Sequence, residues 1–271
     1  MSKKVRIAVA QMRIVKEDEC LKKAEEFIKK ASKKSADIVV FPEYVANCPL
    51  GKPKLLLARK REPHKRFFEK LAKKFDIDIV PGSIIERQNK KFYNTTYYIS
   101  SEGKTLAKYR KQKLWGNEEN SITAGKQSTV VKTKFGKIGL IICWDLAFPE
   151  VFDSMARKGA KIIICPSYWS YEDAKKGLKY NHNAEVIFVN SLCTSRAYVY
   201  ELALVYCNAA GTTYIRGKEV HLLGRSQVAV PFIGPLKRAS HNRECLLIAD
   251  IDLDILKDAR KVYKIRAGLK K

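Results

Sequence analysis

The chain has 271 residues, is 46% hydrophobic, and carries 53 Lys and Arg against 28 Asp and Glu, for a net charge of +25. This length and apolar content allow a large core, so we expect one α/β domain over residues 1–271. No stretch approaches the roughly 18 to 20 consecutive apolar residues that a membrane-spanning helix needs, which excludes such a helix.

Strand-like apolar runs alternate with amphipathic helical patterns along the chain. The first half predicts strands over 5–14, 37–43 and 77–86 and helices over 18–35 and 62–75. FYNTTYYIS and TLAKYRKQ, joined by SEGK, form a predicted hairpin that turns at Glu102 and Gly103. The second half predicts strands over 136–143, 160–167, 202–211, 225–231 and 245–253, and helices over 149–158 and 175–198. Several antiparallel connections indicate a mixed α/β fold and not a simple strand-helix repeat.

The positive charge has two competing interpretations. Lysines in KKAEEFIKKASKKS and PHKRFFEKLAKKF alternate with apolar residues at three- and four-residue spacing, as on the solvated face of a helix. This spacing favours a solvated surface, and nucleic acid is not an expected partner. The alternative is a site for nucleic acid or another polyanion, whose binding would weaken steeply with salt.

Cysteine and histidine usage narrows the chemistry further. The seven cysteines are odd in number and irregularly spaced, so we expect reduced thiols.

The opening MSKKVRIAVAQMRI passes from a charged tip directly into a strand, without a signal peptide's apolar segment, and predicts a cytoplasmic location. The cysteines and the four histidines form no close ligand pairs, so neither a metal nor a cofactor is expected. AGKQS lacks the spacing of a phosphate-binding loop.

Cys143 stands where an apolar strand ends and a polar turn begins, in LIICWDLAFPE. Pro149 and Glu150 follow in the first turn of a predicted helix, a position that suits proline. A nucleophile at such a corner is held out of the sheet, near backbone N–H groups that can bind an oxyanion. A nearby cation would lower the pKa of the thiol. The alternative is a packed thiol at the end of a buried strand.

A thiol nucleophile needs a base, and Glu43 is the better candidate. His64 and His241 lie in highly charged stretches that we expect to be exposed. ADIVVFPEY instead leads four apolar residues into Pro42 and Glu43, at a strand end where loops collect functional groups. The alternative is a solvated loop charge.

A third stretch, KTLAKYRKQKLWGNEENSITAG, supplies cations just before Trp115. A cation beside a thiol and a carboxylate would favour the thiolate and stabilise an oxyanion. The alternative is the solvated face of an edge strand. The candidates are Lys108, Arg110, Lys111 and Lys113.

In this order and context, the Glu, Lys and Cys stretches resemble the nitrilase superfamily of carbon–nitrogen hydrolases. The resemblance extends over IAVAQM, IVVFPEY, KYRKQKL, GKIGLIICWDLAFPE, GAKIIICPSYW, GRSQVAVP and LLIADIDL. It implies a four-layer α-β-β-α sandwich and a Glu-Lys-Cys triad that attacks an amide or nitrile carbon. It also implies a homodimer or a larger homo-oligomer.

The resemblance assigns a role to each member of the triad. Glu43 corresponds to the general base, and Cys143 to the nucleophile that forms a thioester with loss of ammonia or an amine. Lys111, in YRK, corresponds to the family's lysine and would hold the tetrahedral oxygen together with the backbone N–H of Trp144.

A second family glutamate falls on Glu118, counting back from Gly125, and Glu119 is its near neighbour. Lys113 stands where the family often has histidine. SRAYVYE places Val199 at another expected glutamate position, unless Glu201 takes it.

The substrate is expected to be a small amide, of the ω-amide or N-carbamoyl amine type. CWD followed by FPE in a short chain is similar to the amidase and carbamoyl-amine branches of the family. One alternative is that the enzyme hydrolyses nitriles. The other is that the protein is a catalytically idle member of the fold that binds a polyanion. Four aromatic residues beside the motifs either wall an acyl pocket or pack in the core: Tyr44, Trp144, Tyr168 and Trp169.

Overall fold

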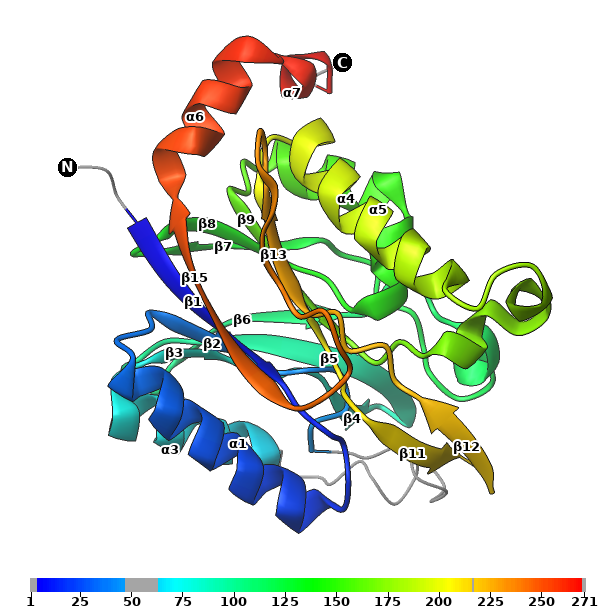
Figure 1. Ribbon diagram of the computed structural model, residues 1–271. Helices are drawn as coiled ribbons and strands as arrows, with labels where there is room; N and C mark the ends of the chain where they lie inside the picture. Colours follow the sequence, from blue (N-terminus) through cyan, green and yellow to red (C-terminus); the bar gives the residue numbers. More distant parts are fainter. Residues whose placement is uncertain (1–3, 47–62, 216, 270–271) are drawn as a thin grey trace.

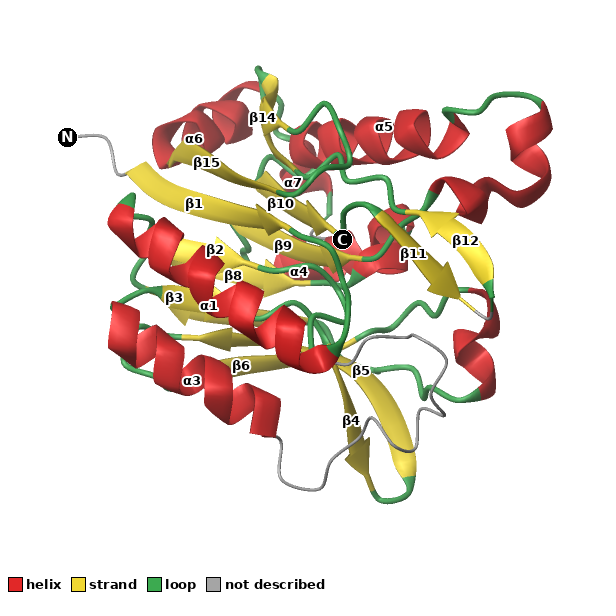
Figure 2. Cartoon of the chain, turned by 60° about the horizontal axis from the view of Figure 1, so that its bottom comes forward, coloured by secondary structure: helices red, strands yellow, loops and turns green. Residues whose placement is uncertain are grey.

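Two β-sheets lie face to face, and helices cover the outer side of each (Figures 1 and 2). The structure is a computed structural model that describes residues 4–46, 63–215 and 217–269. Within these ranges the first sheet has the order β15-β1-β2-β3-β5-β4, with β6 beside β5. Its strands are β1 (Lys4–Gln11), β2 (Ile38–Val40), β3 (Asp78–Val80), β4 (Ile84–Gln88), β5 (Lys91–Ile99), β6 (Thr105–Arg110) and β15 (Cys245–Asp252).

The second sheet has the order β14-β13-β10-β9-β8-β7. Its strands are β7 (Thr129–Thr133), β8 (Gly136–Leu140), β9 (Ile162–Ser167), β10 (Ala203–Asn208), β13 (Gln227–Val230) and β14 (Gly234–Arg238). A separate hairpin pairs β11 (Thr212–Ile215) with β12 (Lys218–His221). The helices are α1 (Glu17–Lys33), α3 (Pro63–Phe75), α4 (Pro149–Arg157), α5 (Ala184–Val199), α6 (Leu253–Val262) and α7 (Ile265–Gly268). Short 3₁₀ helices are η1 (Gly116–Asn120), η2 (Cys143–Ala147) and η3 (Tyr171–Lys179).

Alternation along β1 shows how the four layers are built. Val5, Ile7 and Val9 join the core between the two sheets, whereas Ala8 and Ala10 join the core beneath the helices. Successive side chains of a strand point to opposite faces, so an uninterrupted apolar run serves both cores. The four-layer α-β-β-α sandwich is thereby confirmed.

Helix α1 shows the amphipathic pattern that the sequence predicts. Its buried residues recur every three or four positions and face the first sheet: Cys20, Ala24, Ile28 and Ala31. The lysines between them lie on the solvated side of an amphipathic helix. On the other side of the molecule, α4 and α5 cover the second sheet (Figure 1). No helix in the described parts of the chain is long and apolar enough to cross a membrane.

Two predicted elements are divided in the structure. The strand expected over 77–86 is two strands, because Pro81 and Gly82 turn the chain between β3 and β4. Gly82 has φ +68°, and a Cβ there would lie 1.9 Å from the carbonyl oxygen of Pro42, so only glycine allows this approach. The helix expected over 175–198 is the end of η3 followed by α5, with Lys175 at φ +49°.

His64 is buried and not exposed as expected. Its Nε2 lies 2.9 Å from Oε1 of Glu17, across the contact between α3 and α1. This histidine therefore joins the first turns of the two helices.

Candidate active site

The candidate site forms where strands of the first sheet end beside a turn of the second. Strands β2 and β3 are parallel, β5 is antiparallel to β3, and β6 is antiparallel to β5. The carboxyl ends of β2, β3 and β6 therefore share one edge, where loops collect functional groups. Glu43 follows β2, Lys111 follows β6, and Cys143 begins η2 after β8.

Lys111 is an ammonium held between two buried carboxylates. Its Nζ lies 3.1 Å from Oε1 of Glu43 and 2.8 Å from Oε2 of Glu118, and the Lys111 side chain is 1% exposed. Burial alone would lower the pKa of Lys111, but the two carboxylates outweigh it and hold that pKa well above its ordinary value. The cation is therefore permanent at neutral pH.

The backbone on both sides of Lys111 is fixed as well. Lys111 donates its N–H to the carbonyl of Asn94 at 2.8 Å, and its own carbonyl accepts the N–H of Gly125 at 2.8 Å. A Cβ on Gly125 would lie 2.2 Å from the carbonyl oxygen of Arg110, so glycine is needed for this close approach.

Glu43 differs from Glu118 in its proton affinity. Burial raises the pKa of Glu43, the nearby charge of Glu118 adds to the rise, and Lys111 offsets only part of it. The pKa of Glu118 is lowered, because Lys111 and a backbone N–H outweigh the effect of burial. Of the two carboxylates, Glu43 is thus the one suited to accept and return a proton.

Cys143 lies in a strained turn against Glu43. It has φ +49°, in the left-handed region that few residues other than glycine adopt, and is 6% exposed. The Glu43 carboxylate and the backbone N–H of Tyr168 both lie near enough to Cys143 to act on its pKa. Burial raises the pKa of the thiol well above its ordinary value, Glu43 adds to the rise, and Lys111 offsets part of it.

The resting Cys143 is therefore a thiol and not the thiolate that a neighbouring cation alone would favour. A thiol beside a carboxylate of raised pKa can pass its proton to that carboxylate as it attacks. Trp144 follows in the first turn of η2, where backbone N–H groups have no intrahelical acceptor.

The structure distinguishes Glu118 from Glu119, and Lys111 from Lys113, which sequence spacing alone could not do. Glu118, and not the exposed Glu119, is buried against Lys111. Glu118 also accepts the hydroxyl of Tyr44 at 2.5 Å and the N–H of Trp115 at 2.8 Å. Lys113 lies outside the cluster and pairs with Glu150 at 2.6 Å.

Val199 and Glu201, the two alternatives for another family glutamate, lie in different surroundings. Val199 is exposed at the end of α5, and Glu201 is buried, where it accepts the N–H of Ile265 at 2.7 Å. Neither residue contacts Lys111 or Cys143 among the described contacts.

An aromatic cluster extends from Trp144. Its ring centroid lies 4.2 Å from that of Trp115, 5.4 Å from that of Trp169 and 6.3 Å from that of Phe188. Trp169 is buried and donates its indole N–H to Glu185 at 2.6 Å, so it packs the core as well as bordering the cluster.

A second aromatic contact lies beside the carboxylates. Tyr44 and Tyr168 meet edge to face at 5.8 Å between ring centroids. Trp144, Tyr44 and Tyr168 are only partly buried, and their place in the wall of an acyl pocket stays a prediction.

Two site residues escaped the sequence analysis. Asn94 donates its amide to Oε1 of Glu43 at 2.7 Å and to Oε1 of Glu118 at 3.4 Å, and so joins the two carboxylates. Asp145, two residues after Cys143, is completely buried. A polar residue in the middle of a buried strand, as in FYNTTYY, is the signal that could have identified Asn94.

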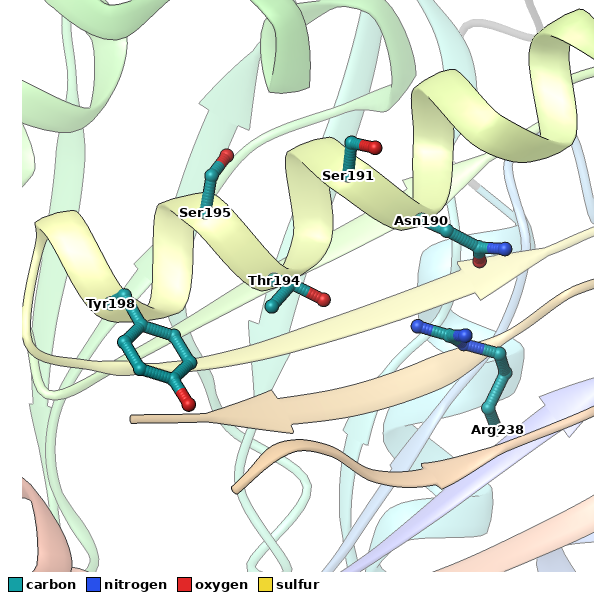
Figure 3. Close-up of a pocket in the computed structure, with 6 residues that line it drawn as sticks. All are labelled: Asn190, Ser191, Thr194, Ser195, Tyr198 and Arg238. Atoms are coloured by element: carbon teal, nitrogen blue, oxygen red, sulfur yellow. The ribbon is translucent and has the colours of Figure 1, made fainter. Parts of the chain in front are cut away.

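A groove on the outer helix layer is separate from these groups. It lies between α5 and β14, and its lining residues do not include any of the charged residues around Cys143 (Figure 3). They are Asn190, Ser191, Thr194, Ser195, Tyr198 and Arg238. Among the described residues no group of three or more His, Cys, Asp or Glu side chains could hold a metal ion.

Known proteins resemble this chain over most of its length. Residues 6–261 match the carbon-nitrogen hydrolase family model. The chain is 29% identical to omega-amidase NIT3 of Saccharomyces cerevisiae, over 98% of this chain and 93% of that one. It is 27% identical to an N-carbamoylputrescine amidase of Arabidopsis thaliana, over 89% of this chain and 84% of the relative.

Solved structures extend the comparison to the fold. A carbon-nitrogen hydrolase from Helicobacter pylori superimposes with a TM-score of 0.88 at 25% identity, covering 97% of this chain and 94% of that chain. Nit3 of Saccharomyces cerevisiae, described as a member of the nitrilase superfamily, superimposes with a TM-score of 0.80 at 28% identity, covering 96% and 94%. The resemblance carried by the sequence motifs is confirmed, and the chain belongs to the carbon-nitrogen hydrolase family of the nitrilase superfamily.

Proposed function

We propose that this enzyme hydrolyses the C–N bond of a small amide, with Cys143 as nucleophile and Glu43 as general base. The observation that carries the proposal is the buried ion-pair cluster of Lys111, Glu43 and Glu118, with Lys111 and Glu43 near enough to Cys143 to act on the pKa of its thiol. Such a set of groups supplies a nucleophile, a base beside it and a fixed positive charge for an oxyanion.

In the first half of the reaction, Sγ of Cys143 bonds to the amide carbon while its proton passes to Glu43. The resulting oxyanion is stabilised by Lys111 Nζ and the backbone N–H of Trp144. The C–N bond then breaks, and Glu43 returns the proton to the departing nitrogen, which leaves as ammonia or an amine.

The second half removes the acyl group. Water attacks the thioester carbon as Glu43 takes one of its protons, and the C–S bond breaks to release the carboxylic acid. The proton returns to the Cys143 sulfur, which restores the starting thiol. Lys111 keeps its charge throughout and needs no proton exchange, in agreement with its raised pKa.

The substrate class proposed is an ω-amide or an N-carbamoyl amine. Both classes are represented by the names of relatives, omega-amidase and N-carbamoylputrescine amidase. Ammonia release from a panel of small ω-amides, N-carbamoyl amines and nitriles tests the proposal. Turnover of at least one amide supports it; hydrolysis of nitriles alone, or of no compound, would contradict it.

Activity is expected to depend on pH through Glu43. The base must be deprotonated before it can accept the thiol proton, so kcat/KM should rise with pH as Glu43 ionises. Because burial raises its pKa above the usual 4.5, the rise should be centred above pH 4.5. A profile of kcat/KM between about pH 4 and 9 measures this. An acid limb centred at or below the ordinary glutamate value would contradict the assignment.

Glu118 and Glu119 form a matched pair for testing the second glutamate. Glu118→Gln removes a charge 2.8 Å from Lys111 Nζ and should lower kcat by about 100-fold, because the cation loses one of its two carboxylate partners. Glu119→Gln changes an exposed neighbour and should leave kcat within about twofold. Steady-state kinetics of both variants decide the matter, and equal effects would remove Glu118 from the site.

Three expectations from the sequence are retained as proposals. We infer a homodimer or larger assembly, and light scattering of the purified enzyme measures its mass. The exposed apolar side chains of Ile187, Phe188 and Val199 on α5 support association through that layer.

A cytoplasmic location and a single domain over 1–271 are likewise proposed.

A further inference from the structure

Asp145 is a completely buried carboxylate that accepts four hydrogen bonds. Oδ1 accepts the backbone N–H of Lys113 at 2.8 Å and that of Gln112 at 3.2 Å. Oδ2 accepts the Tyr109 hydroxyl at 2.7 Å and the backbone N–H of Ile142 at 2.9 Å. Each oxygen of the Asp145 carboxylate thus accepts two hydrogen bonds.

The four donors come from two different sheets. Tyr109, Gln112 and Lys113 flank Lys111 at the end of β6, in the first sheet. Ile142 immediately precedes Cys143, after β8 of the second sheet. One carboxylate therefore joins the backbone around the candidate cation to the backbone that carries the candidate nucleophile.

Stability alone does not account for this carboxylate. Within the described residues Asp145 has no cation in contact, and Lys111 acts on it only at longer range. Burial raises the pKa of Asp145 to about 6, although three hydrogen-bond donors act to lower it. A buried charge without a contacting cation is costly to desolvate, so a geometric role is the better explanation for its presence.

We propose that Asp145 is a positioning residue, which holds the strained Cys143 turn at a fixed distance from Lys111. The proposal rests on the function proposed above and adds a residue that touches neither substrate nor reacting atoms. It predicts that loss of the carboxylate impairs the reactivity of the thiol more than it impairs substrate binding. A misplacement of about 1 Å at such a site costs about 100-fold in rate.

Asp145→Asn is the informative variant, because an amide of the same shape has one acceptor oxygen and cannot receive all four donors. Asp78 provides a matched control: it is 2% exposed and accepts the Tyr98 hydroxyl at 2.6 Å and the Ser101 N–H at 2.8 Å. It begins β3, at the opposite end of that strand from the candidate site.

Four quantities should be measured on both variants. They are kcat and KM for the smallest amide hydrolysed, the rate of Cys143 alkylation by iodoacetamide, and the thermal unfolding midpoint. Alkylation is followed on the Cys143 peptide by mass spectrometry. Asp145→Asn should lower kcat about 100-fold, keep KM within about threefold and slow alkylation about 10-fold or more. Asp78→Asn should lose comparable thermal stability while kcat and alkylation stay within about twofold.

A folded Asp145→Asn variant that keeps kcat and alkylation within about threefold of the parent would overturn the proposal. So would an Asp78→Asn variant that loses both to the same degree. If Asp145→Asn does not fold, Tyr109→Phe removes a single donor and should lower alkylation and kcat about threefold to tenfold; no change would overturn the proposal. Alkylation needs no substrate, so it tests Asp145 even if the parent hydrolyses no amide.

Discussion

Replacing Cys143 by alanine is expected to reduce ammonia release by at least about 10⁴-fold, for every amide that the parent hydrolyses. The variant removes the atom that bonds to the amide carbon, while Glu43, Lys111 and Glu118 remain in place. Because Cys143 is small and lies in a turn, the free energy of unfolding should change by no more than about 1–2 kcal/mol. Steady-state ammonia release and urea unfolding measure the two effects.

Cys193→Ala is the matched control for this variant. Cys193 is completely buried in α5 and is not placed in the site, so its removal should cost stability but keep kcat within about threefold. Turnover by Cys143→Ala at a tenth of the parent rate or more would show that another group attacks the amide.

Replacing Lys111 by methionine is expected to abolish activity and to destabilise the fold together. The variant keeps much of the side-chain length but leaves the buried carboxylates of Glu43 and Glu118 without their shared cation. Removing one partner of a buried ion pair typically costs about 3–5 kcal/mol. Loss of the positive charge at the oxyanion should lower kcat by about 1000-fold or more. Urea unfolding and steady-state kinetics on one preparation measure both.

Lys113→Met is the matched control, two residues along the same segment. Lys113 pairs with Glu150, and both side chains are substantially exposed, so its loss should change the free energy of unfolding by less than about 1 kcal/mol. Adding Glu43→Gln to Lys111→Met should recover part of the lost stability and none of the activity, since it removes one uncompensated charge. Equal stability of the Lys111→Met and Lys113→Met variants would contradict a buried cation at 111.

Two of the three principal candidate residues could be predicted from the sequence because each stands at the end of an apolar run. Glu43 and Cys143 are where buried strands stop, and such ends carry functional groups in α/β folds. Lys111 could not be distinguished from its neighbouring cations by pattern alone, and its place came from the family resemblance. The structure supplies the physical reason: its side chain is 1% exposed between two carboxylates, whereas Lys113 reaches the surface.

Other features depended on contacts between distant segments. Asn94 bonds to Glu43, 51 residues away, and Asp145 bonds to the segment around Lys111, more than 30 residues away. Local periodicity carries no information about such pairings. The division of the 77–86 strand was more accessible, since Pro81 and Gly82 form a recognised turn signal. The break before α5 was accessible too, since Gly177, Asn181 and Asn183 in KKGLKYNHN are turn-forming residues.

The chemistry proposed for Cys143 is tested most directly by trapping the acyl group on the enzyme. Parent enzyme mixed with a hydrolysed amide, quenched in acid within one turnover and digested, should yield the Cys143 peptide with the mass of the acyl group added. Ammonia released in that interval should match the acylated fraction, and the Cys143→Ala variant should give neither. Ammonia released in the first turnover with no acyl mass on that peptide, or with the mass on another residue, would contradict a thioester at Cys143.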